Sequence, residues 1–154
     1  MSEQIIKKVL ITGANGFIGG TLMRYYQNQG QDVVGVDLVG NGADIVEGDI
    51  AEPDTISHLL QECDVIVHTA ALVSNAMQDS DMWRVNVLAT RNLIDAAKEH
   101  KVRRFVQISS IVAYGNSAEG ETDENQPVHA DGGSYVLTKL ASEHVVLSAQ
   151  ANDD

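Results

Sequence analysis

A tyrosine and a lysine stand four residues apart near the end of the chain, Tyr135 and Lys139 in "SYVLTKLASEH". Residues at this spacing share one face of a helix, so both side chains can reach one reacting group. An ammonium group beside a phenol stabilises the phenolate, and the tyrosine can then act as a general acid and base. The pair alone is weak evidence, because the spacing also arises by chance.

Two serines in "QISSIVAYG", Ser109 and Ser110, follow a short run rich in β-branched and aromatic residues that predicts a strand. A hydroxyl group at the end of that strand can donate a hydrogen bond to a carbonyl oxygen and hold a substrate beside the tyrosine. Ser110 could equally be an ordinary turn or helix-capping serine. The serine, tyrosine and lysine together favour proton transfer to or from a substrate oxygen.

The segments that must position these side chains alternate between strand and helix patterns. Strands are predicted at 8–13, 32–38, 43–49, 64–70 and 103–110, and helices at 17–30, 52–63, 81–100 and 134–150. This alternation predicts an α/β fold, a doubly wound parallel sheet with helices on both faces. The link at 39–42 is too short for a crossover helix. We favour a bare loop there over a third strand that is not parallel.

Three glycines in "ITGANGFIGG", Gly13, Gly16 and Gly19, lie directly after the first strand and open the first helix. Such a turn needs residues without a Cβ, and the helix N-terminus offers free N–H groups and a positive dipole end to phosphates. Glycines alone are weak evidence in a chain that has 13 of them, and the turn could lack a ligand. Its position between strand and helix predicts a diphosphate site.

Asp37 ends the second strand, 18 residues after Gly19. A carboxylate there can accept hydrogen bonds from both ribose hydroxyls of an adenosine and would repel the additional phosphate of NADP. No arginine follows Asp37 to bind that phosphate. NAD is therefore favoured over NADP, unless Asp37 is an ordinary aspartate at a strand end.

The third and fourth strands end in residues suited to the same ligand. In an open parallel sheet ligands lie across the carboxyl ends of the strands, so Asp49 and Ile50 are expected to flank the adenine. Ala70 and Ala71 are small enough to let the cofactor pass close to the backbone. His68 is interpreted as a core histidine with satisfied hydrogen bonds rather than a catalyst.

Length and composition fit one domain over residues 1–154, with a formal net charge of -12. This charge argues against nucleic acid and anionic membranes as partners. The single cysteine, Cys63, excludes an internal disulfide and is expected to be buried and unreactive. No metal site is predicted. The sequence shows no signal peptide and no apolar run of membrane-spanning length, so we expect a cytoplasmic protein.

The order of "TGANGFIG", Asp37, "GDI", "HTAA", "VNVLAT", "SSIVAYG" and "YVLTK" resembles the extended short-chain dehydrogenase/reductase family over almost the whole chain. This family includes NAD-dependent sugar-nucleotide epimerases and dehydratases and the 3β-hydroxysteroid dehydrogenases. The resemblance implies a Rossmann-like domain, NAD as cofactor, and hydride transfer between a secondary alcohol and the nicotinamide. The substrate would be a sugar nucleotide or a sterol-like alcohol.

The resemblance also implies a role for each matching residue. The catalytic residues would be Ser110, Tyr135, Lys139 and Asn86, although Asn86 could instead be an exposed helix residue. The residues that would bind the cofactor are Gly13, Gly16, Phe17, Ile18, Gly19, Asp37, Asp49, Ile50, Thr69, Ala70, Ala71, Tyr135 and Lys139.

Family members continue beyond the helix that carries the tyrosine and lysine, with a C-terminal lobe that binds substrate. We therefore expect this chain to be the cofactor-binding part, truncated before that lobe, and to form a homodimer through helices 81–100 and 134–150. Two alternatives stay open. The chain could be a small enzyme that takes its substrate pocket from a partner chain, or a non-catalytic NAD-binding module.

Overall fold

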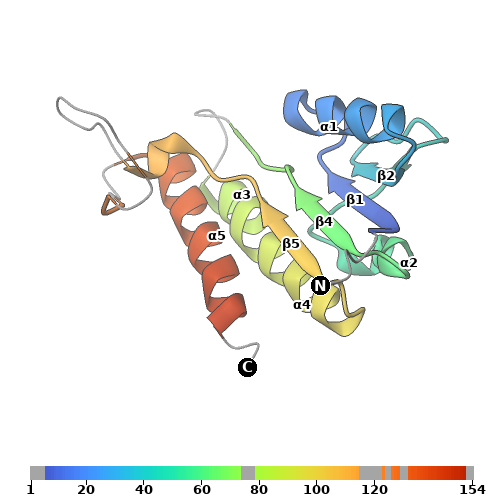
Figure 1. The fold of residues 1–154 in the computed structure, drawn as a ribbon. Helices are drawn as coiled ribbons and strands as arrows, with labels where there is room; N and C mark the ends of the chain where they lie inside the picture. The colour runs from blue at the N-terminus through green and yellow to red at the C-terminus, as the bar shows by residue number, and fades with distance from the viewer. Residues whose placement is uncertain (1–5, 74–78, 115–122, 124–125, 129–131, 152–154) are drawn as a thin grey trace.

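The computed structural model describes residues 6–73, 79–114, 123, 126–128 and 132–151. Within these residues one parallel sheet runs through the molecule in the order β3-β2-β1-β4-β5 (Figure 1). Strand order reverses between β1 and β4, as in doubly wound nucleotide-binding sheets. The strands are β1 (Lys8–Thr12), β2 (Asp32–Asp37), β3 (Ile45–Glu47), β4 (Val65–His68) and β5 (Arg104–Gln107). The predicted fold class is confirmed.

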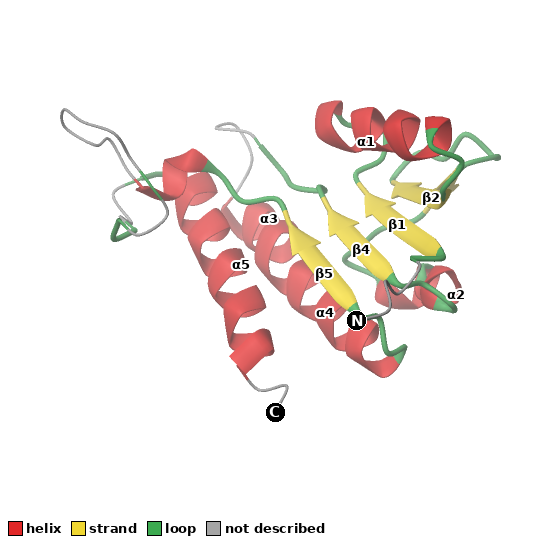
Figure 2. Cartoon of the chain, in the orientation of Figure 1, coloured by secondary structure: helices red, strands yellow, loops and turns green. Residues whose placement is uncertain are grey.

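Helices cover both faces of this sheet (Figure 2). α1 lies on one face, and α2, α4 and α5 lie on the other. The α-helices are α1 (Phe17–Asn28), α2 (Ser57–Leu60), α3 (Asp79–Trp83), α4 (Ala89–Glu99) and α5 (Ser134–Ala151). Two 3-10 helices, η1 (Pro53–Thr55) and η3 (Ile111–Tyr114), and one π-helix, η2 (Arg84–Leu88), complete the described elements. None of the described helices is long and apolar enough to cross a membrane.

The alternation of side chains along β1 explains the two core layers. Val9 and Ile11 face α1 and pack with Met23, whereas Leu10 faces α4 and packs with Leu93. Full burial of such side chains stabilises the fold by roughly 1.5–3 kcal/mol each. Strands buried on both faces must be apolar almost throughout, which is why the sequence reads as short unbroken hydrophobic runs.

β3 follows β2 without a crossover helix. The pairing Gly35 to Ile45 through Asp37 to Glu47 is parallel, so the bare loop is confirmed. The side-chain oxygen of Asn41 accepts hydrogen bonds from the N–H groups of Ala43, Asp44 and Ile45 at 2.9–3.1 Å. One asparagine thus replaces the hydrogen bonds that a helix would otherwise supply to this connection.

Two predicted helices differ from the observed ones. The segment 52–63 contains only η1 and the four-residue α2, because Thr55 donates to the carbonyl of Glu52 in a tight turn and Glu62 adopts a left-handed φ of 60°. The predicted helix 81–100 is interrupted by the π-helix η2, in which the N–H of Ala89 donates to the carbonyl of Arg84. Such π-bulges often accompany functional sites.

Candidate functional site

The turn between β1 and α1 brings two backbone segments unusually close. Gly13 has a φ of +68°, and a Cβ on it would lie 2.8 Å from the backbone nitrogen of Ala70. A Cβ on Gly19 would lie 2.2 Å from the carbonyl oxygen of Gly13. No side chain fits in either place, so both glycines are required by the backbone itself. The N–H of Gly13 donates to the carbonyl of Val36, and the absence of side chains at both glycines leaves the space around the turn open to a ligand.

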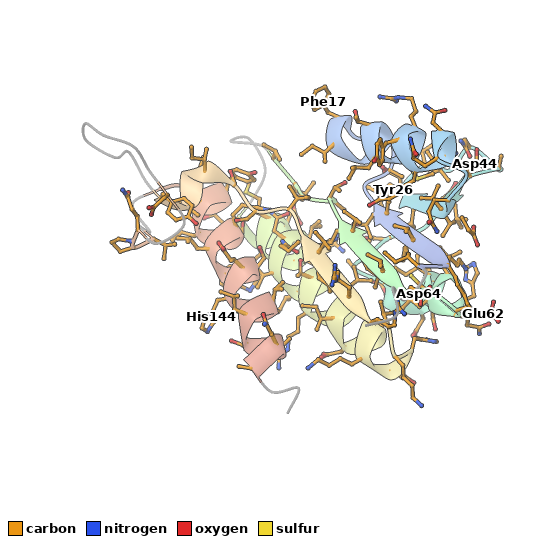
Figure 3. The ribbon with its side chains drawn as sticks, in the orientation of Figure 1. Phe17, Tyr26, Asp44, Glu62, Asp64 and His144 are labelled. Carbon is orange, nitrogen blue, oxygen red and sulfur yellow. The ribbon has the colours of Figure 1, made fainter. Side chains whose placement is uncertain are left out.

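The N-terminus of α1 is suited to an anion. Gly16 is the N-cap, no side chain caps the helix, and no acidic residue lies in its first turn. The first N–H groups of a helix have no carbonyl one turn earlier, so they and the helix dipole favour a negative charge. Phe17 is 93% exposed and points away from the sheet (Figure 3), and Ile18 is also exposed. These two residues can contribute their backbone, not their side chains, to a diphosphate site.

Asp37 holds its carboxylate at the end of β2. One oxygen accepts the N–H of Asn15 at 2.8 Å and the other accepts the N–H of Leu38 at 2.8 Å. Each carboxylate oxygen has a second lone pair, so Asp37 can still accept two further hydrogen bonds. The geometry suits the two hydroxyls of a ribose.

A cavity of about 490 Å³ opens at the carboxyl ends of the inner strands. Most of the predicted cofactor residues line it: Gly13, Gly16, Asp37, Asp49, Ile50, Thr69, Ala70 and Ala71. Residues that the sequence did not single out complete the lining, namely Val36, Leu38, Gly48, Leu72, Asp81, Arg84 and Val85. Gly19, Phe17 and Ile18 lie outside the lining, as do Tyr135 and Lys139.

Arg84 is the missed residue with the clearest contact. Its guanidinium lies 3.6 Å from the carboxylate of Asp49, whose other oxygen accepts the N–H of Ala51. Arg84 belongs to η2, two residues before Asn86, and both half-exposed charges border the cavity. The motif "VNVLAT", which begins directly after Arg84, gave no sign that Arg84 would pair with Asp49.

Lys139 on α5 is buried, 4% exposed, and reaches the end of β5. Its ammonium donates to the carbonyl of Ile108 at 2.6 Å, which places it beside the chain that leads into Ser109 and Ser110. Burial lowers the pKa of Lys139, and the nearby carboxylate of Glu143 partly opposes this shift. The structure thus brings the predicted lysine and serines to one end of the sheet.

Ser110 and Tyr135 are the other two predicted catalytic residues near the end of β5. The Ser110 oxygen accepts the N–H of Val112 at 3.5 Å, so the serine also begins η3, and its hydroxyl proton is not used by that bond. Tyr135 lies four residues before Lys139 on α5, and α5 contacts η3. The contact between α5 and η3 thus brings the elements that carry these two residues together.

Asn86 is not an exposed helix residue, because it is only 3% exposed. Its side-chain oxygen accepts the N–H of Leu72 at 2.7 Å, and its side-chain nitrogen donates to the carbonyl of Leu72 at 3.0 Å and to the hydroxyl of Thr138 at 3.1 Å. The amide therefore links Leu72, which lines the cavity, to Thr138 on α5, the helix that carries Tyr135 and Lys139.

His68 and Cys63 have the surroundings expected from the sequence. His68 is 1% exposed, and hydroxyl groups lie within hydrogen-bonding distance of both its ring nitrogens. Burial, and to a lesser extent the charge of Lys139, lowers the pKa of His68 to about 3. Cys63 is buried and donates to the carbonyl of Val65, and burial raises the pKa of its thiol. Neither residue faces the cavity.

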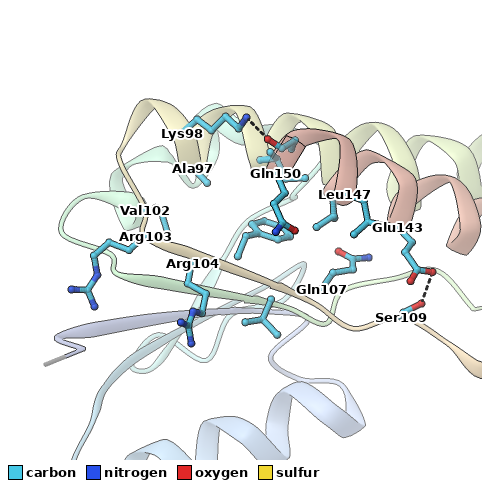
Figure 4. A pocket seen from close by; sticks show the side chains of 15 residues that line it. Ala97, Lys98, Val102, Arg103, Arg104, Gln107, Ser109, Glu143, Leu147 and Gln150 are labelled. Carbon is cyan, nitrogen blue, oxygen red and sulfur yellow. Dashed lines mark hydrogen bonds between the residues drawn. The ribbon is translucent and has the colours of Figure 1, made fainter. Parts of the chain in front are cut away.

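A larger hollow of about 680 Å³ runs between β5 and α5 (Figure 4). Gln107, Ser109, Glu143 and Leu147 lie along it, and Ser109 donates to Glu143 at 3.2 Å. None of the residues predicted to bind the cofactor lines this hollow. The smaller cavity is the functional candidate, because the glycine turn, the helix N-terminus and Asp37 meet there.

A family model described as the NAD dependent epimerase/dehydratase family matches residues 9–154, so the chain belongs to this family. The resemblance inferred from the motifs is confirmed. The family comprises enzymes, and its members share the Rossmann-like fold observed here.

Solved structures and curated relatives agree with this assignment. A short-chain dehydrogenase/reductase superfamily protein from Agrobacterium tumefaciens with bound NAD is similar, with a TM-score of 0.86 and 33% identity over 94% of this chain and 45% of that one. The structure of MoeE5 in complex with UDP-glucose and NAD is also similar, with a TM-score of 0.85 and 33% identity over 95% of this chain and 50% of that one. Sterol demethylase protein B from Methylococcus capsulatus is 33% identical over 90% of this chain and 45% of its own. The chain spans about half the length of the curated relatives it matches.

Proposed function

We propose that this chain, over residues 1–154, binds NAD in the 490 Å³ cavity and is the cofactor-binding part of an NAD-dependent epimerase, dehydratase or hydroxyl dehydrogenase. The observation that carries the proposal is the meeting of three features at one sheet edge. These are the close glycine turn, the N-terminus of α1 without an acidic residue, and the free lone pairs of Asp37. Together they match a diphosphate and a ribose.

The proposal includes a preference for NAD over NADP. Asp37 is held by two backbone N–H groups, so it cannot turn away from a phosphate on the ribose. The residues that follow it, Leu38 and Val39, are exposed and uncharged. Arg84, the cation that lines the cavity, is paired with Asp49.

The chemistry we propose uses the residues at the end of β5 and on α5. Bound NAD supplies the hydride acceptor. The hydroxyl of Ser110 donates a hydrogen bond to the substrate oxygen, and Tyr135 accepts the proton of the substrate hydroxyl. Lys139 holds the nicotinamide ribose and, as a buried cation, stabilises negative charge on Tyr135. Asn86 positions Lys139 through Thr138.

The substrate class we favour is a sugar nucleotide, supported by the similarity to MoeE5, whose structure holds UDP-glucose and NAD. The similar Methylococcus protein supports a sterol-like alcohol as the second candidate. Calorimetric titration of the folded chain with NAD tests the proposal at its first step. We expect saturable binding of one NAD per chain, and a folded chain that binds no NAD contradicts the proposal.

Replacing Tyr135 by phenylalanine tests the catalytic assignment. In a single turnover with NAD and UDP-glucose, we expect the variant to form NADH at least about 100-fold more slowly than the wild type, because general acid-base catalysis contributes about 10²–10⁴-fold. The affinity for NAD should change little. The measurement is the absorbance of NADH, with Tyr25→Phe on exposed α1 as the matched control. Equal rates in both variants would exclude Tyr135 as the catalyst.

We also propose a cytoplasmic homodimer whose interface lies on the helices of 81–100 and 134–150. Exposed apolar side chains on these helices, Trp83, Leu88 and Leu137, support this surface. Replacing Leu88 by glutamate should convert a dimer to a monomer, because a charge in an apolar interface is not solvated. Light scattering after size exclusion measures the mass. A wild-type monomer at all concentrations would rule out the interface.

A further inference from the structure

A buried row of hydrogen bonds crosses the molecule from β1 to α4 through His68. The hydroxyl oxygen of Thr12 lies 2.6 Å from Nδ1 of the ring, and that of Thr90 lies 2.9 Å from Nε2. The Thr90 hydroxyl donates in turn to the carbonyl of Asn86 at 2.8 Å. Thr12, His68 and Thr90 are each at most 1% exposed. Water cannot replace any of these partners.

The direction of every bond in this row follows from its ends. The single hydroxyl proton of Thr90 is used on the carbonyl of Asn86, so Thr90 accepts from His68 and Nε2 carries the hydrogen. Nδ1 is then the acceptor and receives the proton of Thr12. The Thr12 oxygen accepts the N–H of Ala70 at 3.2 Å. The neutral ring with hydrogen on Nε2 is the one form that satisfies all four neighbours.

A charged ring would break the row. With hydrogen on both nitrogens, His68 and Ala70 would both donate to Thr12, and the Thr12 proton would lose its acceptor. The positive charge of Lys139 adds repulsion, which lowers the pKa of His68 further. His68 is therefore held neutral, as a bridge with one donor and one acceptor.

The residues at both ends of the row, Thr12 and Asn86, hydrogen-bond to the backbone of segment 70–72, which forms one wall of the cavity. Thr12 holds the N–H of Ala70, and Asn86 holds the N–H and the carbonyl of Leu72. Ala70 and Leu72 line the cavity, and Ala70 is the residue against which the missing Cβ of Gly13 would collide. The hydrogen-bond row therefore supports the spacing between this wall and the glycine turn, together with Thr69, whose N–H and hydroxyl both donate to the carbonyl of Thr12.

We infer that His68 is a positioning residue for the cofactor: it joins Thr12 to Thr90 and so holds the wall at Ala70 to Leu72 in register with the glycine turn. It touches neither cofactor nor substrate. The inference rests on the proposed NAD site. A purely structural role would stabilise the fold without a specific effect on the wall or on NAD.

The test compares His68→Phe, which keeps a ring against Phe105 but removes both hydrogen bonds, with His68→Gln, which keeps one donor and one acceptor. Ile66→Val, a buried change two residues earlier on β4, is the control for lost stability alone. Amide hydrogen exchange of Ala70 and Leu72 is measured by NMR without ligand, and NAD affinity by calorimetry. Thr90→Val replaces His68→Phe if that variant does not fold.

We expect exchange at Ala70 and NAD dissociation constants to rise about tenfold or more in His68→Phe, with His68→Gln closer to wild type and Ile66→Val unchanged in NAD affinity. Exchange at Ala70 that matches Ile66→Val would overturn the inference, whatever happens to NAD. If the wild type binds no NAD but His68→Phe still speeds amide exchange at Ala70, the NAD site is refuted and the role of His68 in positioning the wall is kept. NAD affinity equal in wild type and His68→Phe would refute that role for the cofactor.

Discussion

Replacing Gly13 by alanine should lower the free energy of unfolding by about 3 kcal/mol and weaken NAD binding by about 100-fold or more. Part of the loss is conformational, because a φ of +68° is unfavourable for any residue with a Cβ. The rest is steric, because the new methyl group would lie 2.8 Å from two backbone atoms of Ala70. Neither backbone segment can yield without opening the cavity. Chemical denaturation and calorimetric titration with NAD measure the two effects.

Gly30→Ala separates the two causes. Gly30 has nearly the same φ, +70°, but a Cβ there would meet nothing within 4 Å, at the opposite end of α1. We expect this control to lose only the conformational cost, about 1–2 kcal/mol, and to bind NAD like the wild type. If Gly13→Ala behaves like Gly30→Ala in both measurements, the close approach at Ala70 is not part of the site.

Replacing Asp37 by alanine should raise the dissociation constant for NAD by about 100-fold, because two charge-assisted hydrogen bonds to the ribose hydroxyls are lost, together about 3 kcal/mol. The preference for NAD over NADP should shrink at the same time, since the repulsion of the additional phosphate disappears. Calorimetric titrations of wild type and variant with each dinucleotide give the four constants.

Asp32→Ala is the matched control for this change. Asp32 is an exposed aspartate at the other end of the same strand, so its loss alters the net charge equally without touching the cavity. We expect it to bind NAD as the wild type does. Equal weakening in both variants would show that net charge, not ribose binding, determines the affinity. An unchanged preference in Asp37→Ala would remove Asp37 as the source of cofactor selectivity.

Much of the fold could be predicted from local pattern. Buried parallel strands must be apolar on both faces, so the hydrophobic runs "KVLITG" and "DVIVHTA" can be predicted as strands without tertiary information. The site residues at the strand ends could then be predicted as well, because parallel strands have their carboxyl ends at the same edge of the sheet. Asp37, Asp49 and Ile50 therefore line one cavity although they are separated along the chain.

The remaining features depend on contacts between distant segments. The π-helix at 84–88 comes with the burial of Asn86 against Leu72 and Thr138, which helical periodicity cannot reveal. Asn86 is buried because its side chain hydrogen-bonds to Leu72 on one side and to Thr138 of α5 on the other. The pairing of Arg84 with Asp49 joins η2 to the end of β3 and likewise needs the tertiary structure.

The central claim is that NAD binds between the glycine turn and Asp37, and NMR titration of the isotope-labelled chain tests it most directly. Added NAD should shift the backbone amide signals of residues that line the cavity, above all Gly13, Asp37, Ile50 and Ala70, and leave those along β5 and Leu147 in place. Shifts confined to the hollow between β5 and α5, or no shifts in a folded sample, would contradict the account.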